Sequence, residues 1–250
     1  MTIPRGDVIL VTGATGAIGS EIAAQAAETG AIVAVHGSSA ESVAGAMERF
    51  HVRVADARLI AAPADFREEG AIEAMVAKVA AEAGRIDAVV HCGITGAAGV
   101  AGPLAKADAA NFGDHAALVL GSFQRLCYAA LPHLSVRGGT IIGFASDAGK
   151  FASPRQAIIG AAFGGIMTFV RNLALEVSRQ GVRVHCISPS FVADTPVFEK
   201  HAARAGAAFD RAGLGLPTPK DIAPIALFLC GPGAAKITGQ IISINGGLNA

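Results

Sequence analysis

The sequence predicts one α/β domain over residues 1–250, built on a seven-stranded parallel sheet with helices on both faces. Short runs rich in valine, isoleucine and leucine alternate with stretches of helical pattern along the whole chain, the order of a parallel sheet joined by crossover helices. The runs are apolar throughout, which is typical of strands buried on both faces. A chain of 250 residues that is 52% apolar, without a linker or repeat, is sufficient for one large core.

The seven apolar runs that we expect to be strands read, in chain order, DVILVT, AIVAVH, RLIAAPAD, IDAVVHC, GTIIGFA, VRVHCI and QIISI. They lie at residues 7–12, 31–36, 58–65, 86–92, 139–145, 182–187 and 240–244. The stretches between them predict helices at residues 17–28, 41–50, 69–83, within 111–134, at 155–179 and at 220–230. Residues 188–219 are expected to form a loop.

The composition bounds the function. Lys and Arg balance Asp and Glu at 20 each, and no run of basic residues occurs, so binding to nucleic acid or to an anionic membrane is not expected. Only 16% of the residues are charged, which suggests that part of the apolar surface is covered in a permanent oligomer.

The four cysteines are far apart and form no paired-ligand motif, which predicts buried free thiols in a reducing compartment and no metal site. They are Cys92, Cys127, Cys186 and Cys230. The N-terminus leads into the first strand without a long apolar leader, and no apolar run free of polar breaks reaches about 18 residues. We therefore expect a soluble cytoplasmic protein.

The first strand ends in TGATGAIG, from Thr12 to Gly19, and a helix begins inside this motif. Backbone N–H groups at a helix N-terminus, together with the helix dipole, form an anion site. Glycines at 13, 16 and 19 allow a tight turn, close approach to a pyrophosphate and packing against the sheet. The position of this loop after the first strand of an α/β chain favours dinucleotide binding.

Motifs along almost the whole chain resemble the short-chain dehydrogenase/reductase family. They are TGATGAIG, Asp65-Phe66 after the third strand, CGI after the fourth, GGTIIGFAS around the fifth, PSFVADTP after the sixth and GQIISINGG at the end. The resemblance implies a Rossmann-type, doubly wound domain. It also implies a nicotinamide dinucleotide as cofactor, and a homo- or hetero-oligomer formed through the fourth and fifth helices.

The resemblance assigns the cofactor contacts to residues of these motifs. Asp65 would bond the adenine amino group, and Val192 and Thr195 would contact the nicotinamide carboxamide. The remaining cofactor-binding positions are Thr12, Gly13, Thr15, Gly16, Ile18, Gly19 and Gly93, with the spacing TGxxGxxG of the family's extended branch.

The end of the second strand leaves the choice of cofactor open. It reads His36-Gly37-Ser38-Ser39, with no acid for a ribose 2′-hydroxyl and no arginine for a 2′-phosphate. NAD and NADP both remain candidates, with a lean away from NAD, and weak or absent binding is a third alternative.

The resemblance also implies a proton relay that this chain lacks. Members of the family donate the proton from a tyrosine, which is assisted by a lysine four residues later, a serine and an asparagine. The serine position is Ser146, but Ile159, Phe163 and Leu118 stand at the tyrosine, lysine and asparagine positions. Hydrocarbon side chains donate no proton, and the loss of general acid catalysis lowers a rate by roughly 10²–10⁴-fold.

A shift of the alignment does not restore the relay. The only tyrosine, Tyr128, lies in the fourth helix, and no lysine occurs between Lys150 and Lys200. Four candidate substitutes remain, each with a structural alternative. They are His91 at the edge of the sheet, Asp147 and Lys150 beside Ser146, and Arg155, which would hold an acidic substrate group.

Three hypotheses follow. The first is a non-catalytic subunit of a hetero-oligomeric NAD(P)-dependent dehydrogenase acting on an alcohol, a ketone or an acyl thioester, paired with a complete family member. The second is an active oxidoreductase with a relocated proton donor, His91 or Asp147 acting with Ser146. The third is a sensor that binds a dinucleotide without turnover.

Overall fold

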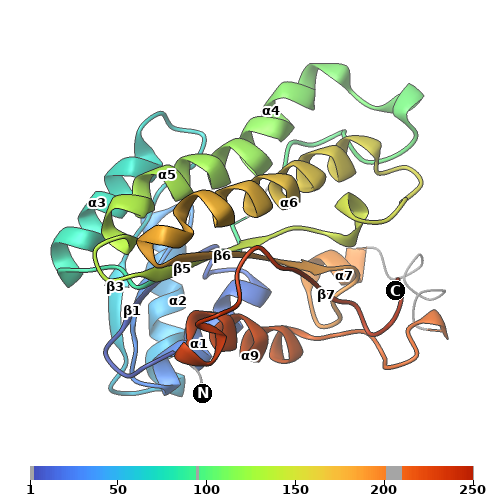
Figure 1. Ribbon diagram of the computed structural model, residues 1–250. Coiled ribbons are helices and arrows are strands. Elements are labelled where there is room, and N and C mark those ends of the chain that lie inside the picture. The colour runs from blue at the N-terminus through green and yellow to red at the C-terminus, as the bar shows by residue number, and fades with distance from the viewer. Residues whose placement is uncertain (1–2, 94–95, 201–209, 250) are drawn as a thin grey trace.

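A computed structural model describes residues 3–93, 96–200 and 210–249, and its core is a seven-stranded parallel sheet (Figure 1). The strand order is β3-β2-β1-β4-β5-β6-β7, which confirms the predicted sheet. The strands are β1 Val8–Thr12, β2 Ile32–Val35, β3 Arg58–Ala61, β4 Ala88–His91, β5 Gly139–Phe144, β6 Val182–Pro189 and β7 Ile241–Ile244. The order reverses between β1 and β4, and ligands of open α/β sheets bind at such a switch point.

Helices form a layer on each face of the sheet, as Figure 1 shows. One layer contains α3 (Ala71–Ala83), α5 (Ser122–Leu134) and α6 (Ala157–Val177). The other contains α1 (Ala17–Glu28), α2 (Ala40–Arg53) and α9 (Pro219–Cys230). This is the doubly wound arrangement that the sequence predicted.

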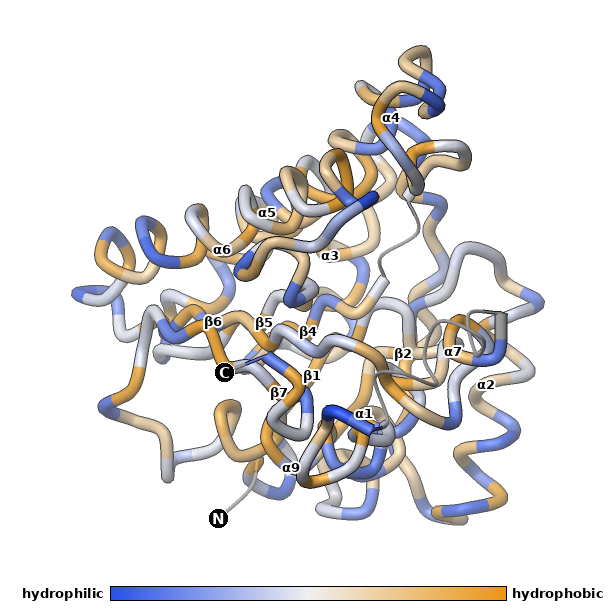
Figure 2. Tube along the Cα trace, turned by 90° about the vertical axis from the view of Figure 1, so that its right-hand side faces the viewer, coloured by the Kyte–Doolittle hydropathy of each residue, from blue (hydrophilic) through white to orange (hydrophobic). Residues whose placement is uncertain are grey.

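The strands alternate their side chains between two hydrophobic cores. In β1, Val8 and Leu10 belong to the core under α3, α5 and α6, whereas Ile9 and Val11 belong to the core over α1, α2 and α9. All four side chains are fully buried. Because successive strand residues point to opposite faces, an unbroken apolar run supplies both cores, and Figure 2 shows hydrophobic residues along the central strands between the helix layers.

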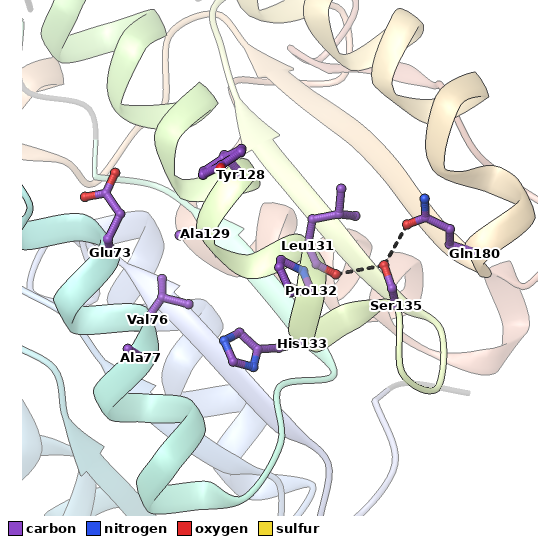
Figure 3. A pocket seen from close by; sticks show the side chains of 10 residues that line it. All are labelled: Glu73, Val76, Ala77, Tyr128, Ala129, Leu131, Pro132, His133, Ser135 and Gln180. Atoms are coloured by element: carbon purple, nitrogen blue, oxygen red, sulfur yellow. Dashed lines mark hydrogen bonds between the residues drawn. The ribbon is translucent and has the colours of Figure 1, made fainter.

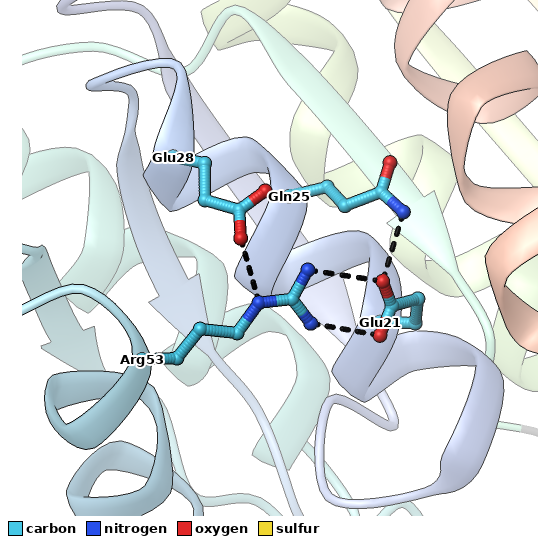
Figure 4. A network of polar contacts seen from close by, with 4 residues as sticks. All are labelled: Glu21, Gln25, Glu28 and Arg53. Atoms are coloured by element: carbon cyan, nitrogen blue, oxygen red, sulfur yellow. Dashed lines mark hydrogen bonds and ion pairs between the residues drawn. The ribbon is translucent and has the colours of Figure 1, made fainter.

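An ion-pair network joins α2 to α1 (Figure 4). Near the end of α2, Arg53 makes a two-pronged contact with Glu21, with Nη1–Oε2 and Nη2–Oε1 distances of 2.8 and 3.1 Å. Its Nε donates to Glu28 Oε1 at 2.6 Å, and Gln25 Nε2 donates to Glu21 Oε1. The bond from Arg53 lowers the pKa of Glu21. This network fixes the helix that carries the glycine loop.

The largest differences from the expected elements lie in two connections. The stretch 111–134 is helical but not uniform: α4 (Phe112–Ala116) passes through a π-helical turn, Ala117–Gly121, into α5. The Ser122 hydroxyl donates to the Leu118 carbonyl at 2.6 Å, a local bond that competes with the regular helix pattern. In the expected loop 188–219, β6 continues to Pro189 and a short helix α7 (Pro196–Lys200) follows, while residues 201–209 lie outside the described part.

One helical stretch among the described residues, Ala157–Gln180, is long and apolar enough to cross a membrane by length and composition, with a mean hydropathy of 1.6. In this fold it covers the sheet. Ile166, Met167 and Val170 are buried against the sheet core, and 28% of the apolar window is buried. Much of this apolar helix therefore lies outside the core of a single chain.

Candidate nucleotide-binding site

The candidate site lies at the carboxyl ends of the strands, where β1 and β4 diverge. Thr12 ends β1 and pairs in register with His91, which ends β4. The glycine loop from Gly13 to Gly16 then turns into α1. The parallel strands therefore bring the glycine loop, the end of β2 and the segments after β3 and β4 to one edge.

Two glycines of the loop are required by close backbone contacts. Gly13 has a φ of +68°, and a Cβ on it would lie 2.7 Å from the Gly93 Cα. A Cβ on Gly19 would lie 2.3 Å from the Gly13 carbonyl oxygen. α1 and the segment after β4 therefore pack closely against the turn. This packing lets the backbone of the loop approach a phosphate group.

The N-terminus of α1 is open to an anion. Its N-cap is the exposed Gly16, without a side-chain cap and with no acidic residue in the first turn. Thr15 and Ile18 beside it are half-buried. The first N–H groups of a helix lack partners within the helix and favour negative charge, so a pyrophosphate group fits these residues.

His36 holds the glycine loop in place, a role that the sequence did not indicate. Its Nδ1 accepts the Gly13 N–H at 3.0 Å, and its Nε2–H donates to the Ala64 carbonyl at 3.0 Å. Its ring stacks on Phe66 with a centroid distance of 4.4 Å. Burial lowers the pKa of His36 to about 4, so the ring is neutral at pH 7. The only sign of this role in the sequence was that a histidine occurs at the end of β2, where a carboxylate would otherwise bind a ribose hydroxyl.

A hollow of about 120 Å³ adjoins the loop on the β2–β3 side. Asp65 and Leu118 lie on its wall, which gives it a carboxylate acceptor and an apolar side chain; the wall also contains Gly13, Thr15, His36, Gly37, Ser38, Ala64, Phe66, Arg67 and Gly93. Asp65 Oδ1 accepts the Arg67 N–H at 3.0 Å. Asp65 does not cap α3, whose N-cap is Gly70. A purine with an amino group matches this combination of an acceptor and an apolar surface.

The segment after β6 carries the two residues that were expected beside a nicotinamide. Val192 and Thr195 are both buried. The Thr195 hydroxyl donates to the Val192 carbonyl at 2.8 Å and accepts the Phe198 N–H at 3.2 Å. Thr195 thus stabilises the start of α7, and its donor capacity is already used.

Ser146 lies at the end of β5, beside the helix that carries Ile159 and Phe163. It caps a short 3₁₀ turn, Asp147–Gly149, by accepting the Ala148 N–H at 3.3 Å. This turn packs on α6, because a Cβ on Gly149 would lie 2.7 Å from the Phe163 carbonyl carbon. Phe163 packs on the sheet core. Leu118 belongs instead to the wall of the hollow near Asp65.

His91 lies in an environment that does not suit proton exchange with a substrate. It is fully buried, and its ring stacks between Phe66 and Phe123, at centroid distances of 6.1 and 5.4 Å. Its Nδ1 is 2.8 Å from Thr12 Oγ1. Burial lowers the pKa of His91 to about 3. We therefore do not retain His91 as a proton donor.

Asp147 and Lys150 are engaged with the last strand. The buried Asp147 carboxylate accepts from the hydroxyls of Ser188 and Ser243 at 3.1 Å each. It also accepts from the amides of Asn245 and Asn249, at 2.5 and 3.2 Å. Lys150 Nζ donates to Ser243 Oγ at 3.0 Å. With four donors on its oxygens, Asp147 ties the turn after β5 to β6, β7 and the C-terminal segment.

Other features of the described residues lie apart from this edge. Arg155 is exposed with a φ of +71° in the connection before α6. A hollow of about 530 Å³ lies on the helix layer and is lined by residues of α3 and α5, among them Glu73 and Tyr128, as Figure 3 shows for the lining residues. No group of three or more His, Cys, Asp or Glu side chains among the described residues is arranged to hold a metal.

Comparisons with known proteins agree with this geometry. A family model described as enoyl-(acyl carrier protein) reductase matches residues 13–249. A curated relative, the 3-oxoacyl-[acyl-carrier-protein] reductase FabG of Chlamydia trachomatis, is 32% identical over 247 residues and covers 96% of each chain. A second is the (2S)-[(R)-hydroxy(phenyl)methyl]succinyl-CoA dehydrogenase subunit BbsD of Thauera aromatica, which is 30% identical over 96% of this chain and 95% of its own.

Solved structures show the same fold. A dehydrogenase/reductase from Sinorhizobium meliloti matches with a TM-score of 0.89 and 26% identity, over 99% of this chain and 97% of its own. A 7α-hydroxysteroid dehydrogenase complexed with NADH and 7-oxo glycochenodeoxycholic acid also matches with a TM-score of 0.89. It is 25% identical and covers 98% of this chain and 95% of its own.

Proposed function

The chain belongs to the short-chain dehydrogenase/reductase family, and from this membership and the groups at its cleft we propose that it is a non-catalytic subunit of a hetero-oligomeric NAD(P)-dependent dehydrogenase. The proposal pairs it with a second family member that carries the complete serine, tyrosine and lysine set. The substrates of that enzyme are alcohols, ketones or acyl thioesters.

The observation that carries the proposal is the pair of hydrocarbons on α6. Ile159 and Phe163 stand where the family's proton donor and its activating cation belong. Neither side chain holds a charge or exchanges a proton, and Ser146 alone supplies no general acid. The candidate substitutes are engaged elsewhere: His91 is enclosed by aromatic rings, and Asp147 is saturated with donors.

Two further observations support a subunit role. The relative from Thauera aromatica is itself named a subunit of a (2S)-[(R)-hydroxy(phenyl)methyl]succinyl-CoA dehydrogenase. On the layer formed by α5 and α6, Tyr128 is 80% exposed and Leu175 is 79% exposed. Apolar groups so exposed on neighbouring helices suit a surface that is covered by another subunit.

The four cysteines are free thiols, which supports a reducing, cytoplasmic location.

The test is steady-state turnover by the purified chain alone. We expect no oxidation of NADH or NADPH above the buffer rate with a 3-oxoacyl thioester or a ketone panel. The double variant Ile159→Tyr/Phe163→Lys should remain poor in turnover, because the segment around His91 and the Leu118 position still differ from those of an active member. Turnover by the unmodified chain that is lost in Ser146→Ala would overturn the proposal in favour of a relocated donor.

The partner is tested by co-expression. A tagged copy of this chain should co-purify at a fixed ratio with a family member that has the complete catalytic set. The complex should turn over substrate, and a Tyr→Phe change in the partner's catalytic set should abolish that activity, whereas Ser146→Ala in this chain should leave it intact. Loss of activity with Ser146→Ala in this chain would contradict the proposal that it is a non-catalytic subunit.

A further inference from the structure

The two halves of the cleft differ in their chemistry. The half beside β1, β2 and β3 is lined by glycines of the loop and by polar side chains, among them Thr15 and Asp65. The half beside β5 and β6 contains Ser146 next to α6, where the family's polar pair is replaced by Ile159 and Phe163. In a dinucleotide-binding fold, the adenosine diphosphate part occupies the first half and the second base lies across the switch point.

We propose that this cleft is an adenine nucleotide site in which the adenosine diphosphate part supplies nearly all of the binding, and the nicotinamide part supplies almost none. The inference rests on the proposed function, because both follow from the hydrocarbons on α6. It goes further in naming the ligand class: ADP and ADP-ribose bind as well as NAD⁺ does.

The adenosine half has a partner for each part of such a ligand. Asp65 is half-buried, and its Oδ1 is bound by the Arg67 N–H at 3.0 Å and the Arg67 guanidinium at 3.4 Å. Its Oδ2 would accept from the adenine amino group, while Leu118 provides an apolar surface for the purine ring. The uncapped N-terminus of α1 at Gly16 faces the diphosphate. His36 holds the loop in this conformation by accepting the Gly13 N–H on its Nδ1.

The other half offers a nicotinamide riboside little to bind. Ile159 and Phe163 carry no group that bonds a ribose hydroxyl, so hydroxyls that leave water on this side of the cleft gain no partner from α6. The turn that carries Ser146 packs its backbone directly on α6, because a Cβ on Gly160 would lie 2.5 Å from the Ala148 carbonyl oxygen. Lys150 Nζ is held by Ser243 on β7. The free energy that the nicotinamide riboside gains from contacts is therefore about equal to the free energy that it loses by leaving water.

The end of β2 decides between two versions of the ligand. Ser38 and Arg67 line the hollow, and no acid stands at the end of β2. A ligand with a 2′-phosphate is therefore not repelled there, and the shared chemistry is the adenosine diphosphate unit with or without that phosphate. Adenosine 2′,5′-bisphosphate against ADP separates the two.

The experiment is calorimetric titration of the full chain with ADP, ADP-ribose, NAD⁺, NADP⁺ and adenosine 2′,5′-bisphosphate. We expect ADP and NAD⁺ to have dissociation constants within about a factor of ten of each other. In Ile159→Tyr/Phe163→Lys, NAD⁺ should gain about tenfold or more over ADP, since that pair restores groups that reach only the riboside. Thermal unfolding of the variant checks that it folds.

Gly16→Asp is the matched loss-of-binding variant. Gly16 has a φ of −90° and is exposed, so aspartate fits without strain and caps α1 with its own carboxylate. This change should abolish binding of all five ligands while leaving the melting temperature equal or higher. Retained binding in Gly16→Asp would overturn the site.

The outcomes separate this inference from the proposed function. Failure of ADP to bind, or NAD⁺ binding more than about tenfold tighter than ADP, would overturn the inference. Neither result would contradict the proposal that the chain is a non-catalytic subunit. Turnover of NADH in the parallel activity assay would overturn the proposed function whatever the affinities are.

Discussion

At the scale of single residues, His36 does most to shape the candidate site. A neutral imidazole has one donor and one acceptor nitrogen, and His36 uses the acceptor for the Gly13 N–H and the donor for the Ala64 carbonyl. It thereby connects the glycine loop to the segment that carries Asp65. A protonated ring would turn a second N–H toward Gly13 and break the first of these bonds.

Stability should therefore fall when the pH is lowered below about 6.5, the ordinary value for a histidine. Burial lowers the pKa of His36 to about 4 in the folded chain, so between these values the unfolded chain binds a proton that the folded chain does not. Unfolding free energy rises with pH wherever the unfolded state binds more protons. Acidification from pH 7 to pH 5 should lower it by about 2 kcal/mol through His36 alone.

The measurement is urea unfolding of the chain and of His36→Gln at pH 7, 6 and 5, at one protein concentration. Glutamine keeps a donor and an acceptor but does not titrate, so the loss in His36→Gln should be smaller by about 2 kcal/mol. His51→Gln is the control, because His51 is exposed on α2. Equal losses in the chain and in His36→Gln would contradict the assignment.

At the scale of elements, the contact between α6 and the turn after Ser146 depends on glycine. A Cβ on Gly160 would lie 2.5 Å from the Ala148 carbonyl oxygen, whereas a Cβ on Gly164 would lie at an ordinary 3.4 Å from the Gly149 carbonyl oxygen. Both glycines lie inside the same helix. The same substitution at these two positions therefore tests close packing against helix propensity.

We expect Gly160→Ala to destabilise the chain by about 1–3 kcal/mol, because a backbone atom cannot yield as a side chain does. Gly164→Ala should be neutral or stabilise by up to about 1 kcal/mol, since alanine favours the helix. Thermal and urea unfolding of both variants measure the difference. A Gly160→Ala variant as stable as Gly164→Ala would show that the turn carrying Ser146 is free to move.

Elements with a strong apolar pattern were predictable from the sequence, and those set by local bonds were not. The helix at residues 17–28 has the predicted bounds, because a glycine turn and a polar end delimit it. The predicted third strand, 58–65, ends at Ala61, since the pattern cannot show where ladder pairing stops. The π-helical turn and α7 depend on side-chain bonds of Ser122 and Thr195, which have no periodic signal.

The candidate site was predictable only in part for a related reason. The glycine motif and the family resemblance pointed to the loop from Gly13 to Gly16, to Asp65 and to Ser146, and each of these follows a strand end at one edge of the sheet. It could not show that His91 turns into the core or that Leu118 faces the hollow near Asp65. Side-chain direction at a strand end or in a distorted helix depends on neighbours that are distant in the sequence.

At the scale of the whole molecule, the layer of α3, α5 and α6 leaves apolar surface uncovered. α6 is strongly apolar, yet only 28% of its apolar window is buried within the chain. Leu175 on this helix is 79% exposed and Tyr128 on α5 is 80% exposed. An apolar surface on two adjacent long helices is where we propose that a second subunit packs.

Leu175→Glu should therefore disrupt assembly, because burying an unpaired carboxylate in an interface is costly. We expect the unmodified chain to form a dimer or larger assembly in sedimentation velocity, and Leu175→Glu to weaken that association by about tenfold or more. Val52→Glu is the matched control, since Val52 is 90% exposed but lies on α2, on the opposite face of the sheet. It should leave the assembly unchanged. Equal sedimentation of both variants and the unmodified chain would show that no subunit contact involves Leu175. The proposal of a non-catalytic subunit would then lose the support that it draws from the exposed apolar residues on α5 and α6.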